Sequence, residues 1–134
     1  HGQQGLQDML ALTDILVSLL PLTDETKGMI NADTLAQLPQ GASVINAGRG
    51  EQIVDEDLLA ALDSGHIQYA ILDVFKDEPL SESHPYWTHP RVHITPHIAS
   101  ITRNDTAGDR LAENLLRWHQ GEPMMGEVDK QRGY

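Results

Sequence analysis

The chain has 134 residues, of which 40% are hydrophobic and 22% are charged, and this suffices for one domain with a buried core. Nine Lys and Arg residues against twenty Asp and Glu residues give a net charge of −11, which argues against binding to nucleic acid or to an anionic membrane surface. Because the sequence has no cysteine, it excludes a disulfide framework and a thiolate metal site, and we expect a cytoplasmic protein.

Apolar patterns along the chain predict alternating helices and strands. In chain order they predict helix, strand, helix, strand, helix, strand, strand and helix at residues 4–12, 14–20, 31–38, 42–46, 55–65, 69–75, 92–95 and 103–120. The run at 14–20 is nearly all apolar, so we expect this strand to be buried on both faces. Residues 78–90 and 122–134 are expected to be irregular.

Capping residues are predicted at the ends of two of these helices. Asn31 or Asp33 suits the start of the second helix, and Thr102 or Asn104 suits the start of the last one. Gly121 follows the last helix and is expected to end it.

This order of elements predicts an α/β fold with a mainly parallel sheet. In such sheets, ligands bind beyond the carboxyl ends of the strands. Arg49, Glu78 and His97 follow the ends of predicted strands, and Asp73 lies at the end of one. We therefore interpret them as parts of one candidate site.

An arginine, a carboxylate and a histidine can together hold an anionic carbonyl compound and protonate its oxygen. Arg49, flanked by Gly48 and Gly50, offers a planar fork for a carboxylate, although it also fits a surface turn. His97 suits proton transfer near neutral pH, or else a packing role. Glu78 is either a solvated charge or the partner that fixes the tautomer of His97 and favours its protonated ring.

Asp73 ends an apolar strand, where a carboxylate needs partners. It either caps a turn or accepts hydrogen bonds from a ligand amide, and the pattern favours neither reading.

Two other kinds of site are disfavoured. His89, His93 and His97 are spaced by four, but Pro90 and Pro96 break the helix that a metal site would need, so no metal is predicted. The sequence also lacks the nucleophile elbow of a serine hydrolase and any Gly-x-Gly-x-x-Gly loop.

Taken together, these segments resemble the D-isomer-specific 2-hydroxyacid dehydrogenases. The matching segments are residues 19–26, 28–31, 41–50, 57–62, 72–75 with 78–79, and 89–92 with 95–99. The tail, residues 126–134, resembles that of the glyoxylate/hydroxypyruvate reductase A branch. Glu78 argues against the formate dehydrogenases of the same superfamily, which have glutamine at this place.

The resemblance implies a role for each candidate residue. Arg49 would bind the substrate carboxylate and carbonyl, His97 would be the acid/base, and Glu78 would pair with His97. The residues implied along the cofactor are Leu20, Pro21, Ala47, Gly48, Arg49, Asp73 and His97, with Asp73 accepting from the nicotinamide carboxamide. Many relatives have alanine in place of Gly48, and we expect this difference to disturb little.

The resemblance also implies a partial Rossmann-type dinucleotide-binding domain. Residues 1–121 would be the C-terminal part of the NAD(P)-binding domain with its closing helix, followed by the tail at 122–134. The Gly-rich loop and the substrate domain are expected to precede Gln4. The chain does not begin with methionine, so we expect that it starts inside a domain.

The implied activity is reduction of glyoxylate or hydroxypyruvate, 2-oxoacids that become D-2-hydroxyacids. NAD(P)H is the expected cofactor, with NADPH favoured, and the expected assembly is a homodimer. The isolated chain is expected to be inactive. The alternative is a non-catalytic module, either truncated or dinucleotide-sensing.

Overall fold

The computed structural model describes residues 2–100 and 102–130, and it contains two compact units. The first unit spans His1–Ala99 and the second spans Ser100–Tyr134.

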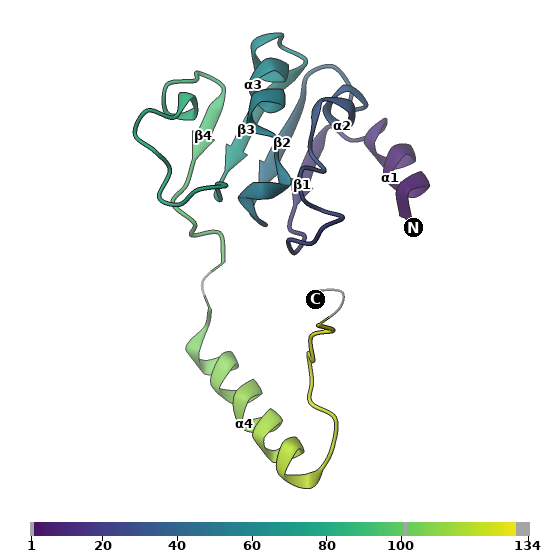
Figure 1. The fold of residues 1–134 in the computed structure, drawn as a ribbon, viewed down its shortest axis with the longest axis vertical. Helices are drawn as coiled ribbons and strands as arrows, with labels where there is room; N and C mark the ends of the chain where they lie inside the picture. Colours follow the sequence, from purple (N-terminus) through teal and green to yellow (C-terminus); the bar gives the residue numbers. More distant parts are fainter. Residues whose placement is uncertain (1, 101, 131–134) are drawn as a thin grey trace. The chain divides into compact units, whose positions relative to one another are not determined.

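A parallel sheet of four strands forms the first unit (Figure 1). The strands lie in the order β1-β2-β3-β4, and their bounds are Ile15–Ser18, Ala42–Asn46, Ile67–Leu72 and Val92–Ile94. Every neighbouring pair is parallel, so the carboxyl ends of all four strands meet at one edge of the sheet. The predicted α/β fold with a mainly parallel sheet is confirmed.

In this unit α1 precedes the first strand, and the other helices lie in the connections between strands. Their bounds are Gly2–Leu10 for α1, Ala32–Ala36 for α2 and Asp55–Asp63 for α3, and two short 3-10 helices lie at Gly50–Gln52 (η1) and Pro85–Trp87 (η2). Asn31 caps α2 by accepting a hydrogen bond from the Thr34 amide, as one of the two predicted caps. Three acidic residues in the first turn of α3 match the positive end of its dipole.

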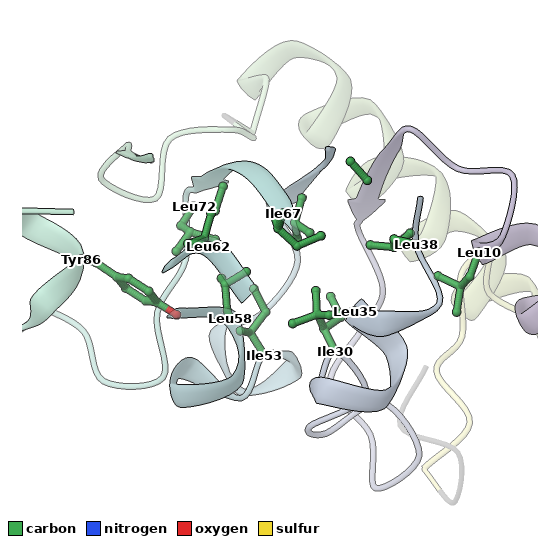
Figure 2. Close-up of a cluster of buried hydrophobic side chains, with 13 residues drawn as sticks. Leu10, Ile30, Leu35, Leu38, Ile53, Leu58, Leu62, Ile67, Leu72 and Tyr86 are labelled. Atoms are coloured by element: carbon green, nitrogen blue, oxygen red, sulfur yellow. The ribbon is translucent and has the colours of Figure 1, made fainter. Parts of the chain in front are cut away.

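The core lies between the helices and one face of the sheet (Figure 2). Leu35 of α2, with Leu58 and Leu62 of α3, packs towards Ile67 and Leu72 of β3. All five side chains are almost fully buried. Burial of each such side chain contributes roughly 1.5–3 kcal/mol, which fixes the helices and hence the loops at the edge of the sheet.

Some predicted boundaries and burials are wrong. β1 was predicted to be buried on both faces, but Ile15 and Val17 are 58% and 50% exposed. Among the described residues, β1 pairs only with β2 and is therefore an edge strand, which an apolar run alone does not reveal. β3 begins and ends earlier than predicted, so that Asp73 lies just beyond the strand.

The second unit contains helix α4, Asn104–Gln120. Its N-cap is Arg103, without a side-chain capping bond, so neither Thr102 nor Asn104 is the cap. Gly121 ends the helix in the left-handed conformation, with φ of 72°, as predicted. After the helix, the amide of Met125 donates to Asn114, and Asn114 donates back to the Met125 carbonyl.

The irregular tail is described as far as residue 130, and residues 131–134 of the predicted tail lie outside the described residues. Within the described residues, no helix combines the length and the apolar character needed to cross a membrane.

Candidate functional site

Three loops leave the carboxyl ends of neighbouring strands and carry the predicted site residues. Arg49 follows β2, Glu78 follows β3, and His97 follows β4. The sheet thus places the three side chains at one edge, as the sequence predicts.

His97 and Glu78 form a direct pair. His97 Nδ1 lies 2.7 Å from Glu78 Oε2, and the other carboxylate oxygen accepts the Phe75 amide at 2.9 Å. The hydrogen bonds from His97 and Phe75 hold the pKa of Glu78 below its ordinary value, although burial opposes the shift. The carboxylate is therefore ionised near neutral pH and fixes one nitrogen of the imidazole ring.

The backbone of His97 is itself constrained. Its φ is 52°, a left-handed conformation that is uncommon for a residue with a side chain. The His97 amide nitrogen donates to the carbonyl oxygens of Asp73, at 2.9 Å, and Thr95, at 3.1 Å. These two hydrogen bonds anchor the turn that directs the imidazole to Glu78.

Arg49 is exposed, and the Asn46 side chain holds its loop. Asn46, which is fully buried, donates to the Arg49 carbonyl oxygen at 3.0 Å and accepts the Gly48 amide at 3.1 Å. The positive charge of Arg49 also contributes to the lowered pKa of Glu78. The guanidinium is therefore within electrostatic reach of Glu78, and its Nη1 donates to the Gly48 carbonyl oxygen at 2.7 Å.

Asp73 is 4% exposed and supports the His97 turn. Its carboxylate accepts hydrogen bonds from the Thr95 hydroxyl and from the amides of Ile98 and Ala99. Burial raises the pKa of Asp73, but the hydrogen bonds and the nearby His97 outweigh burial and bring the pKa below its usual value. Of the two readings open from the sequence, the turn-capping one is the one that these bonds support.

The turn at Leu20 and Pro21 lies against the Ala47–Gly48 segment. A Cβ atom on Gly48 would lie 2.9 Å from the Leu20 carbonyl oxygen and 2.8 Å from Gln52 Oε1. Such contacts are too short to be tolerated without movement of the turn. Alanine at position 48 of this chain would therefore require the turn to move, and the expectation that glycine in place of the relatives' alanine disturbs little stays a prediction.

Sequence reasoning missed Gln52 and Thr95, and it gave Asn46 no role. Asn46 and Gln52 are fully buried, and both hold the Arg49 loop. For Asn46, the signal in the sequence was a polar residue at the end of an apolar strand. Gln52 offered none, because its partners are distant in the chain.

The sequence profile of the family described as "D-isomer specific 2-hydroxyacid dehydrogenase, NAD binding domain" matches residues 2–99. The chain belongs to this dehydrogenase family. The match covers the sheet and all three loops of the candidate site.

Named dehydrogenase relatives agree with this assignment. Glyoxylate/hydroxypyruvate reductase A of Klebsiella pneumoniae (strain 342) is 51% identical over 99% of this chain and 43% of its own length. The chain thus spans less than half the length of the curated relatives that it matches.

Solved dehydrogenase structures share the fold. A D-isomer specific 2-hydroxyacid dehydrogenase from Xanthobacter autotrophicus Py2, in complex with NADPH and MES, is 48% identical with a TM-score of 0.96, covering 100% of this chain and 55% of that one. An NADPH-dependent glyoxylate/hydroxypyruvate reductase from Sinorhizobium meliloti, in complex with NADP and sulfate, is 40% identical with a TM-score of 0.93, covering 100% and 44%. This dehydrogenase domain has no group of three potential metal-binding side chains among its described residues.

Proposed function

We propose that this chain is the C-terminal part of an NADPH-dependent reductase of glyoxylate and hydroxypyruvate. Within it, residues 1–121 would complete the cofactor domain and residues 122–134 would form the tail. The observation that carries the proposal is the 2.7 Å contact between His97 and Glu78 at the sheet edge that also bears Arg49. The names of the most similar relatives support the substrate class.

In this proposal, Arg49 binds the carboxylate of the 2-oxoacid and polarises its carbonyl group. The guanidinium fork matches a carboxylate, and an exposed side chain is available to a ligand. This positive charge is needed because the chain carries a net charge of −11, which repels anions at long range.

His97 is proposed as the acid that protonates the carbonyl oxygen. Since Nδ1 faces Glu78, the proton given to the substrate comes from Nε2. The ionised carboxylate of Glu78 stabilises the protonated ring before transfer. A bound nicotinamide cofactor supplies the hydride that reduces the carbonyl carbon. The product is a D-2-hydroxyacid.

The described residues fit the nicotinamide end of such a cofactor. Because Gly48 has no Cβ, the Leu20–Pro21 turn can pack closely against the segment before Arg49. We propose that Leu20, Pro21, Ala47 and Gly48 line the cofactor. Asp73 would accept a further hydrogen bond from the nicotinamide carboxamide, beside those that its carboxylate already accepts. NADPH is favoured because three of the solved relatives contain NADPH or NADP.

The proposed assembly is a homodimer, and the proposed location is the cytoplasm. The absence of cysteine is compatible with a reducing compartment, since the fold needs no disulfide. The 134-residue chain alone is proposed to self-associate without catalysis. This is favoured by the exposed apolar side chains of Ile15 and Val17 on the edge strand β1.

The proposal is tested by comparing two proteins, the 134-residue chain and the longer protein in which it would form the C-terminal part. Each is purified, its intact mass is measured, and oxidation of NADPH by glyoxylate is followed. We expect the longer protein to turn over and the chain alone to be silent. A longer protein that binds NADPH but reduces neither glyoxylate nor hydroxypyruvate would rule out the proposed activity.

A further inference from the structure

Gln52 is a buried polar residue that joins two loops of the candidate site. It lies at the end of η1, has no exposed surface, and comes three residues after Arg49. We infer that Gln52 is a positioning residue that holds the Leu20–Pro21 turn and the Arg49 loop at a fixed separation. This inference rests on the proposed function, because the turn is placed along the cofactor and Arg49 on the substrate.

The side-chain amide of Gln52 makes contacts on both sides. Its Nε2 donates to the carbonyl oxygens of Leu20, at 2.9 Å, and Pro21, at 3.2 Å. Its Oε1 accepts the Ser18 hydroxyl at 2.7 Å and, more weakly, the Arg49 amide at 3.4 Å. One amide group therefore connects the exit of β1 with the residue proposed to bind the substrate.

Only a side chain that both donates and accepts can make this set of contacts. A hydrocarbon side chain would leave the Leu20 and Pro21 carbonyl oxygens and the Ser18 hydroxyl without these partners. A carboxylate would place a negative charge against two carbonyl oxygens. Each unsatisfied buried group is unfavourable, so the loops would move apart or admit water.

Gly48 makes the arrangement sensitive to small movements. Its Cα lies in a gap so narrow that a Cβ would be 2.8 Å from Gln52 Oε1 and 2.9 Å from the Leu20 carbonyl oxygen. The turn, Gly48 and Gln52 are therefore in close contact. A shift of the turn is transmitted to the segment that carries Arg49, and cofactor and substrate sites move together.

The first test is Gln52→Met in the longer reductase, since methionine keeps the length of glutamine and removes the amide. We expect KM for glyoxylate and Kd for NADPH both to rise, with kcat/KM falling about ten- to a hundredfold. Tyr86→Phe is the matched control, because it also removes a buried hydrogen bond, 2.9 Å long, to Asp55. It should lower stability while leaving both constants unchanged.

The second test is Gln52→Glu. Its Kd for NADPH is divided by the wild-type Kd at each pH. When protonated, the introduced carboxyl group can donate to the turn and accept from Ser18, so the loss in NADPH affinity should shrink as the pH falls. A ratio that does not change with pH would overturn the inference, as would Gln52→Met with unchanged constants.

Two further outcomes are also decisive. If Gln52→Met does not fold, the acid recovery of Gln52→Glu still supports positioning, and failure of both variants to fold at every pH would show a purely structural role. NADPH affinity is measured by titration without turnover. Thus a wild-type protein that binds NADPH without reducing glyoxylate would overturn the proposed function while the Gln52 comparison remained valid.

Discussion

Gly50 lies so close to Phe75 that a methyl group on its Cα would overlap the Phe75 carbonyl group and the Lys76 amide nitrogen. The residue after Arg49 is thereby packed directly on the loop that leads to Glu78. This contact between backbones joins the loop that carries Arg49 to the loop that carries Glu78, and the charge of Arg49 contributes to the lowered pKa of Glu78.

Gly50→Ala should therefore destabilise the chain by about 3 kcal/mol or more, since backbone atoms cannot rotate away from the added methyl group. Urea unfolding of the 134-residue chain measures this loss. Gly5→Ala in α1 is the control, because nothing lies within 4 Å of a Cβ there, and it should be neutral or slightly stabilising. Equal unfolding midpoints for the two variants would contradict the close packing.

The strands and the placement of the candidate residues after strand ends could be predicted from the sequence, because their signals are local. Apolar runs mark β2 and β4, and Arg49, Glu78 and His97 follow strand ends within a few residues. Parallel pairing then brings them to one edge without further information.

The exposure of β1 and the role of Gln52 could not be predicted, because both depend on distant residues. An edge strand is defined by which strands pair with it, and β1 has the same apolar composition as a central strand. The amide of Gln52 bonds to Ser18, Leu20 and Pro21, which lie 34, 32 and 31 positions away. The tight contact at Gly48 has the same origin, since the Leu20 carbonyl oxygen lies 2.9 Å from the position that a Cβ would take.

His97→Ala in the longer protein should lower kcat about a hundred- to ten-thousandfold, the usual range for loss of a general acid. KM for glyoxylate should change little, because Arg49 still binds the carboxylate. Steady-state kinetics with NADPH separate the two constants. His93→Ala removes an exposed histidine on the neighbouring strand β4 and should keep wild-type turnover. Retained turnover in His97→Ala would refute the acid/base assignment.

Glu78→Gln should lower kcat/KM for glyoxylate at neutral pH and change it less in acid. The ionised carboxylate that accepts from His97 is lost as the pH falls through the lowered pKa of Glu78, whereas an amide of the same shape carries no charge at any pH. The kcat/KM values of the two proteins should therefore converge as the pH falls. The measurement is kcat/KM for glyoxylate against pH in both proteins. Superimposable profiles would show that the pair does not act in proton transfer.

Asp73→Asn should reduce stability most at neutral pH and least in acid. Burial opposes ionisation of Asp73, but the hydrogen bonds to its carboxylate lower its pKa in the folded chain below the ordinary value of 3.8. The ionised group therefore stabilises the fold fully above about pH 3.8, and this contribution disappears as the pH falls through the lower folded value.

The difference in unfolding free energy between wild type and Asp73→Asn should be about 1.5–3 kcal/mol at neutral pH, the usual range for hydrogen bonds to a charged group. It should shrink towards zero as the pH falls below 3.8. Asp24→Asn, at an exposed position, should instead follow the wild-type curve. Urea unfolding across this pH range measures all three proteins. A difference that is constant with pH would mean that the lost stability comes from altered packing of the His97 turn and not from the charge of Asp73.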